Sequence, residues 1–134
     1  MHYLSVTSDA TPSEWLRGVL ELCVLRVMAE GPTYGYAIAA DLAAAGFGDI
    51  KGGTLYPLLA RLQKNALVSI EWRTGEGGPG RKYFTLTAAG RDQLNGGLAQ
   101  WQVFSTRVTS HLSPASTGHA PPTAGFRTSS RSTA

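Results

Sequence analysis

Apolar residues recur at helical spacing in a short stretch near the middle of the chain. Its four leucines, Leu55, Leu58, Leu59 and Leu62, fall on one side of a helix. The other side carries Tyr56, Pro57, Ala60, Arg61 and Lys64. This pattern predicts an amphipathic helix over 54–65, with one face anchored in a core and the other offered to a partner.

Pro57 bears on where this helix begins. A proline is tolerated in the first turn, where its missing N–H would be unpaired anyway, so the helix is expected to start at Gly53 or Thr54. That start leaves free N–H groups and the positive end of the helix dipole beside Thr54 and Tyr56. An anion such as a phosphate is favoured there.

Two helices are predicted before this stretch. The first begins at Thr11-Pro12, where Thr11 and Glu14 form a capping box, and runs to about Glu30. Its second half, 22–28, is apolar almost all the way round, so a second subunit is expected to cover part of it. The next helix, Ala37 to Ala45, ends at Gly46 and leads through a glycine-containing link into 54–65, which is the helix-turn-helix pattern.

Two alternating segments follow, and they predict a β-hairpin. In 67–74, Val68, Ile70 and Trp72 alternate with polar residues, which assigns Trp72 to the core. In 81–87, Phe84 and Leu86 point inward. The tip between them spells G-x-G-x-x-G, but a dinucleotide site needs this motif to open a helix, whereas here a strand follows. No cofactor is therefore predicted.

A last helix is predicted from Thr87 to Leu112, and its apolar residues form a seam with four-three spacing. The seam consists of Leu94, Leu98, Trp101, Val108 and Leu112, with Ser105 as its polar member. A seam on a terminal helix with few elements left to cover it predicts a dimer. Gly96-Gly97 leaves two alternatives open, a continuous helix and one kinked or split there, because each internal glycine costs about 1 kcal/mol.

The uneven distribution of charge along the chain bears on the kind of partner it binds. Residues 1–50 carry two basic and six acidic side chains, a net charge of −4, whereas 51–91 carry seven basic and two acidic ones, a net charge of +5. The middle third is therefore a basic pole suited to a polyanion, with a merely solvated charged face as the alternative reading.

The remaining composition argues against other classes of protein. Cys23 lies in an apolar helical pattern and is expected to pack as a small hydrophobe. His2, His111 and His119 lie in or near the ends, and no paired carboxylates or metal-ligand spacing appear, so neither an enzyme nor a metal site is predicted. Without an apolar run of membrane-spanning length or a signal peptide, the protein is expected to be cytoplasmic.

Three blocks of residues together resemble a known family. They are Thr33-Tyr34-Gly35-Tyr36, then 53–59 with the sequence Gly-Thr-Leu-Tyr-Pro-Leu-Leu, and Gly80-Arg81-Lys82-Tyr83-Phe84 followed by Leu86-Thr87 and Gly90. Over roughly residues 14 to 95 the chain resembles the PadR family of bacterial transcriptional regulators. The single terminal helix is similar to the smaller subfamily.

The resemblance implies a mainly α winged helix-turn-helix fold, with a three-helix core, a two-stranded wing and a C-terminal dimerisation helix. It divides the chain into a flexible N-terminus (1–10), a DNA-binding domain (11–88), a dimerisation helix (89–112) and a disordered Ser/Thr/Pro/Ala-rich tail (113–134). By this likeness 54–65 is the recognition helix, and 75–82 covers the wing and its basic base. A homodimer would bind near-palindromic operator DNA, usually as a repressor, and a planar aromatic compound bound near the dimer interface would release it.

Residue pattern and resemblance together single out two sets of site residues. The DNA-binding set is Thr33, Tyr34, Tyr36, Thr54, Tyr56, Pro57, Arg61, Gln63, Lys64, Arg81, Lys82 and Tyr83. The dimer and effector set is Leu22, Leu25, Leu94, Leu98, Trp101, Phe104 and Val108. Packing remains an alternative role for Tyr34, Tyr36 and Tyr56. The alternative for the whole chain is a small-molecule sensor or protein-interaction module that has lost DNA binding.

Overall fold

The computed structural model describes residues 13–74, 78 and 80–115. The predicted Thr11-Pro12 cap, most of the wing tip and the tail beyond 115 lie outside these residues. The chain divides into two units, 1–99 and 100–134. The elements are α1 (Ser13–Met28), α2 (Gly35–Leu42), the π-helical turn η1 (Ala43–Phe47), α3 (Gly52–Lys64), β2 (Val68–Thr74), β3 (Gly80–Leu86) and α4 (Ala88–Leu112).

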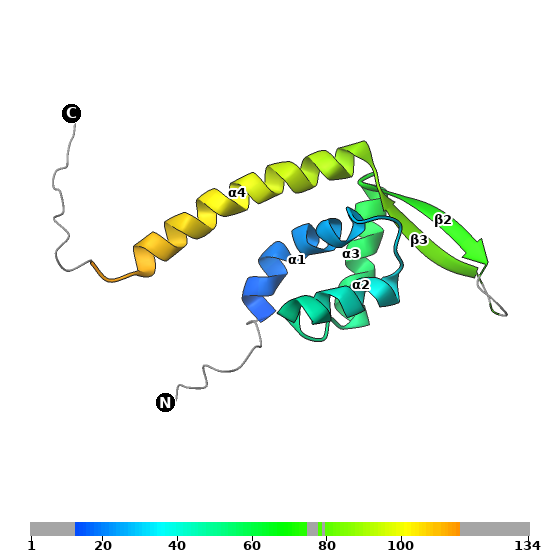
Figure 1. Ribbon diagram of the computed structural model, residues 1–134, viewed down its shortest axis with the longest axis horizontal. Coiled ribbons are helices and arrows are strands. Elements are labelled where there is room, and N and C mark those ends of the chain that lie inside the picture. Colours follow the sequence, from blue (N-terminus) through cyan, green and yellow to red (C-terminus); the bar gives the residue numbers. More distant parts are fainter. Residues whose placement is uncertain (1–12, 75–77, 79, 116–134) are drawn as a thin grey trace. The chain divides into compact units, whose positions relative to one another are not determined.

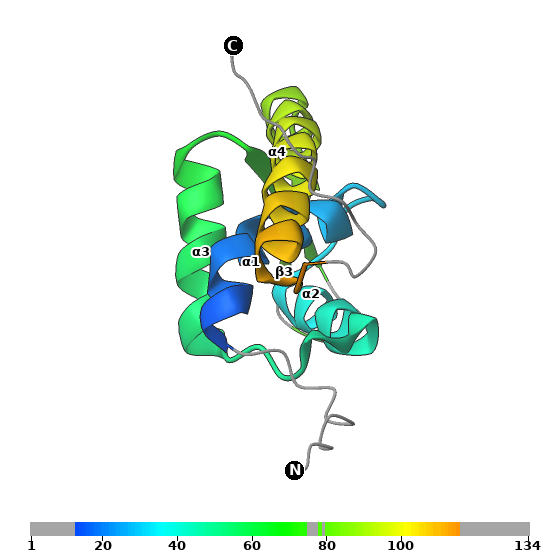
Figure 2. The same ribbon diagram turned by 90° about the vertical axis from the view of Figure 1, so that its left-hand side faces the viewer.

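The core of the first unit lies among α1, α2, α3 and the base of the hairpin. Figures 1 and 2 show these three helices grouped together, and Figure 1 shows the hairpin projecting from them. The largest fully buried side chains are Leu25, Met28, Ile38, Leu42, Leu55, Leu59, Leu62 and Val24. The four leucines of α3 are all buried, as their spacing predicted. The described part of the chain is mainly helical, with one two-stranded antiparallel sheet.

α3 begins one or two residues earlier than the predicted start at Gly53 or Thr54. Lys51 is its N-cap and Gly52 its first residue, so Pro57 lies in the second turn rather than the first. Proline there has no N–H for the carbonyl of Gly53. Because Gly53 and Pro57 are both exposed, water can take the place of that hydrogen bond.

α3 ends in a tight turn that leads directly into the hairpin. The N–H of Ala66 donates to the carbonyl of Gln63 (3.0 Å), and the N–H of Leu67 donates to that of Leu62 (3.0 Å). This pair of hydrogen bonds is the Schellman motif, which usually places glycine in the left-handed position. Here Ala66 occupies it, with φ of 59°.

The hairpin pairs residue for residue from Val68↔Leu86 to Thr74↔Gly80. Thr33 adds a short bridge to its other edge: its N–H donates to the Phe84 carbonyl (3.1 Å), and its carbonyl accepts from the Phe84 N–H (2.7 Å). The segment that leads into α2 is thereby attached to β3.

The prediction that Trp72 belongs to the core is wrong. Trp72 is 68% exposed, although it lies on the same face of the strand as buried Val68. Burial fades along β2 because the strand extends beyond the helices that cover its first residues. Alternation identifies the face of a strand, but it does not say how far the core reaches.

α4 runs without interruption across Gly96-Gly97, so the continuous alternative holds. Thr87 anchors its first turn: the Thr87 Oγ1 hydroxyl donates to the Ala66 carbonyl (2.8 Å) and accepts from the Gly90 N–H (3.0 Å). Gly90 is buried there, and a Cβ at this position would overlap the Leu67 carbonyl. None of the described helices is long and apolar enough to cross a membrane.

Candidate nucleic-acid interface

The outward face of α3 is exposed along its whole length. Its exposed residues include Thr54, Tyr56, Pro57, Ala60, Arg61, Gln63 and Lys64. Arg61 and Lys64 lie in the last turn, where their charges also favour the negative end of the helix dipole. This face combines hydroxyl, amide and cationic donors on a rigid helix.

Tyr56 is positioned by a glycine in another helix. A Cβ on Gly35 would lie 2.6 Å from the Tyr56 hydroxyl and 2.7 Å from its Cε1, so only glycine leaves room for the ring. The ring thus lies against the first turn of α2, and Tyr56 is still 55% exposed. One side of the Tyr56 ring therefore packs against α2, while more than half of the residue's surface stays exposed.

An open hollow of about 450 Å³ lies between α2, α3 and the start of β3. Its polar lining is Tyr34, Tyr36, Tyr56, Arg81 and Lys82, and Leu59, Ala60 and Phe84 add apolar surface. The hollow therefore brings five residues of the predicted DNA-binding set together from separate elements.

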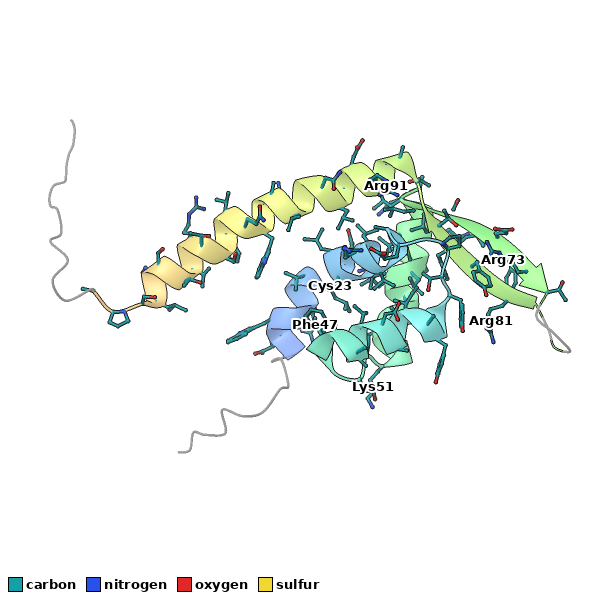
Figure 3. The ribbon with its side chains drawn as sticks, in the orientation of Figure 1. Cys23, Phe47, Lys51, Arg73, Arg81 and Arg91 are labelled. Carbon is teal, nitrogen blue, oxygen red and sulfur yellow. The ribbon has the colours of Figure 1, made fainter. Side chains whose placement is uncertain are left out.

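Two arginines on the hairpin each lie over a tyrosine ring. The guanidinium carbon of Arg81 is 4.2 Å from the centre of the Tyr34 ring, and that of Arg73 is 4.3 Å from the Tyr83 ring. The two rings are themselves 5.3 Å apart between centroids, with an interplanar angle of 59°. Figure 3 labels the two arginines, which both belong to the hairpin.

The hairpin register places these like charges opposite each other. Arg73 and Arg81 are paired residues, an arrangement that is unfavourable unless something else compensates it. Glu71 Oε1 accepts a hydrogen bond from Arg73 Nη2 at 3.2 Å. Among the described residues, Arg61, Lys64, Arg81 and Lys82 form no ion pair, so their charges stay available to an anion.

The start of α3 carries a compensated charge. The Lys51 Nζ donates to Asp49 Oδ2 at 2.8 Å, and this hydrogen bond, with the attraction between the charges, raises the pKa of Lys51. A cation at a helix N-terminus is otherwise unfavourable. Asp49 offsets part of that cost.

Two predicted site residues are buried instead of exposed. Thr33 is 8% exposed, and its backbone is paired with Phe84, so its side chain has almost no surface to offer DNA. Leu25 is 0% exposed within the core of its own chain, so it has none to offer a second subunit. In both cases the covering neighbours come from distant segments, which a local pattern does not reveal.

Arg73 is a residue of this interface that the sequence pattern does not single out. Its signal lies in the hairpin register, which sets it opposite Arg81. That register depends on the exact length of the glycine-rich tip, and composition alone does not determine it.

The predicted dimer and effector residues differ in their exposure. In the first unit, Leu94 is half-buried against the core, Leu98 is 50% exposed, and Leu22 lies where a side chain at Gly97 would meet it. In the second unit, Trp101, Phe104 and Val108 are 41%, 55% and 37% exposed. The Trp101 and Phe104 ring centroids lie 6.2 Å apart.

Cys23 packs against the core of the first unit. Burial raises the pKa of the Cys23 thiol, which keeps it protonated and suits its packing against the core. The described residues contain no group of three or more His, Cys, Asp or Glu side chains that could hold a metal ion.

The helical core, the exposed third helix and the basic hairpin define a winged helix-turn-helix protein. Residues 24–96 match the model of the transcriptional regulator PadR-like family, and the chain belongs to this family. Its members are regulators of transcription rather than enzymes.

Solved structures of the family have the same fold. A PadR family transcriptional regulator from Eggerthella lenta is 40% identical, with a TM-score of 0.69 over 74% of this chain and 86% of that one. A PadR-like regulator from Bacillus cereus is 36% identical, with a TM-score of 0.67 over 75% of this chain and 98% of that one. Bacillus subtilis PadR, solved in complex with operator DNA, is 24% identical, with a TM-score of 0.55 over 60% of this chain and 47% of that one.

Proposed function

We propose that this PadR-like regulator is a repressor that binds near-palindromic operator DNA as a homodimer. The observation that carries the proposal is the hollow at which the exposed face of α3 meets the basic start of β3. A helix face of this kind fits the major groove, and cations beside it fit the phosphates that flank the groove. Bacillus subtilis PadR, which has this fold, is solved in complex with operator DNA, and this supports DNA binding.

Within this mode each side chain of the interface has a role that its chemistry suits. Arg81 and Lys82 bind backbone phosphates from the wing, and Arg61 and Lys64 bind phosphates from the end of α3. Thr54 and Tyr56 donate hydroxyls to a phosphate beside the start of α3. Ala60 and Gln63 face the base edges, with Tyr56 and Lys64 sharing the choice of sequence.

The dimer is proposed to form along α4. Its seam residues Leu98, Trp101, Val108 and Leu112 are between 37% and 74% exposed, which is unusual for a row of large apolar side chains at coiled-coil spacing. A planar aromatic effector would bind beside Trp101 and Phe104 and release the DNA.

The test is to remove the two wing charges together. Arg81→Ala with Lys82→Ala is expected to weaken binding to every duplex and to flatten the dependence of log K on log salt by roughly 1 to 2, because fewer counterions are released. The matched control, Arg17→Ala with Arg26→Ala, removes two charges from α1 and should leave the slope unchanged. Unchanged affinity and slope in the wing variant would contradict the assignment.

The binding site itself provides a second check. Selection from a random DNA pool, followed by footprinting, should give two half-sites related by near-palindromic symmetry. Protection of one asymmetric half-site would count against a dimer.

The alternative function, a sensor without DNA binding, predicts quenching of Trp101 fluorescence by an aromatic ligand while no duplex is bound.

A further inference from the structure

Four side chains at the base of the wing form one continuous stack. The order is Arg73, Tyr83, Tyr34 and Arg81, and the successive distances are 4.3, 5.3 and 4.2 Å, measured from guanidinium carbon or ring centroid to ring centroid. The stack joins β2, β3 and the segment before α2. Both tyrosines are half-buried, whereas both arginines are exposed.

The backbone explains why each arginine turns to a different ring. Arg73 and Arg81 are directly paired, so Arg73 reaches diagonally across the hairpin to Tyr83, two residues along β3. Arg81 reaches the other way, to Tyr34, which the Thr33 bridge holds at the edge of β3. The rings therefore keep two like charges apart while leaving both guanidinium groups accessible.

We infer that Tyr34 and Tyr83 are positioning residues for DNA binding, which act by holding Arg81 and Arg73 ordered before DNA arrives. This inference rests on the proposed function, and it adds Arg73 to the residues that contact phosphate. An arginine loses side-chain freedom when it binds a phosphate, and a side chain already held on a ring loses less. The aromatic rings act through the arginines rather than through their own hydroxyls.

A double-mutant cycle tests whether Tyr34 acts through Arg81. The probe is a labelled duplex of mixed sequence, because wing contacts to phosphate do not depend on sequence. Tyr34→Leu is expected to weaken binding about two- to fivefold, the scale of one exposed cation–π contact. In the Arg81→Ala background the same change is expected to have no effect, and Tyr34→Phe should restore what Tyr34→Leu loses.

The salt series gives a second readout. Arg81→Ala removes a phosphate contact and should flatten the slope of log K against log salt by about 0.9. Tyr34→Leu leaves the arginine in place and should lower the affinity with little change in slope. Tyr83→Leu, alone and with Arg73→Ala, repeats the cycle at the other end of the stack.

Order in the free protein is measured without DNA. Nuclear magnetic resonance should show the Arg81 side-chain protons shifted by the Tyr34 ring in the wild type and in Tyr34→Phe, with the shift lost in Tyr34→Leu. This measurement remains informative even if Tyr34→Leu folds poorly, because the wild type and Tyr34→Phe alone show whether Arg81 lies over an aromatic ring. A wild type that shows the shift but binds no duplex contradicts the proposed function and, with it, the positioning role.

Three results would overturn the inference by itself. One is an equal effect of Tyr34→Leu with and without Arg81, which means that the ring acts independently of it. Another is a loss in Tyr34→Phe as large as in Tyr34→Leu, which assigns the role to the hydroxyl. The third is an unshifted Arg81 side chain in a wild-type protein that binds DNA.

Discussion

All three tryptophans of this chain lie at the surface. Trp15 is 72% exposed, Trp72 is 68% exposed and Trp101 is 41% exposed. Tryptophan is highly buried on average, so its absence from this core is unusual. The core is instead made of smaller aliphatic side chains, chiefly leucine.

Replacing Trp72 tests whether its side chain contributes to the stability of the core. Trp72→Ala is expected to change the free energy of unfolding by no more than about 0.5 kcal/mol, as for an ordinary surface residue. Leu59→Ala, at a position 1% exposed, should cost about 2 to 5 kcal/mol. Urea unfolding followed by circular dichroism measures both. A loss for Trp72→Ala as large as for Leu59→Ala would restore Trp72 to the core.

At the scale of elements, local patterns predicted each element better than they predicted its surroundings. The leucine stripe of α3 and the alternation of Phe84 and Leu86 in β3 are local signals, and both agree with the structure. The Thr33 bridge and the αL conformation of Ala66 have no local signal, because the first depends on a distant strand and the second usually calls for glycine.

The same limit applies to the candidate interface. The residues of α3 could be assigned to an outward face from spacing alone, and their exposure agrees. The stacking of Arg81 on Tyr34 could not, since it brings together residues 47 positions apart through the Thr33 bridge. Exposure is thus partly readable from a sequence, whereas contacts between elements are not.

The two adjacent glycines of α4 provide a matched pair of variants. A Cβ at Gly96 would meet open space, whereas one at Gly97 would overlap the Leu22 side chain. Gly96→Ala is expected to stabilise the protein by about 0.5 to 1 kcal/mol, because alanine loses less backbone entropy in a helix. Gly97→Ala should be at least about 1 kcal/mol less stable than Gly96→Ala, since Leu22 must move. Thermal unfolding compares them, and equal melting temperatures would contradict the packing of Leu22 beside Gly97.

At the scale of the whole molecule, basic charge and exposed apolar side chains lie in different parts of the chain. This separation matches the proposal that one part binds DNA and another forms the dimer. The basic residues collect in the third of the chain that holds α3 and the hairpin, with a net charge of +5 over 51–91. The large exposed apolar side chains of α4 collect at 98–112. A regulator that binds DNA with one part and a second copy with another needs this separation.

Two valines of α4 test the proposal that the dimer forms along this helix. Val108 lies on the seam, whereas Val103 lies on the other side of the helix and is 57% exposed. Val108→Asp is expected to shift the protein from dimer to monomer and to weaken operator binding, while Val103→Asp should leave both unchanged. Sedimentation velocity at several concentrations measures the first effect. A Val108→Asp protein that stays dimeric would show that copies meet through another surface.

The residues around Thr87 form a joint that connects the start of α4 to the end of α3. Thr87 binds the carbonyl of Ala66 through its hydroxyl and that of Leu67 through its N–H (3.1 Å), and Gly90 leaves no gap beside Leu67. The start of α4 and the end of α3 are thus clamped to the same two residues. We expect a rotation of the first turn of α4 to move the last residues of α3, where Arg61 and Lys64 lie, because both helix ends are attached to Ala66 and Leu67. The joint therefore links the helix proposed to form the dimer to the helix proposed to bind DNA, so that a change in the first would alter the second.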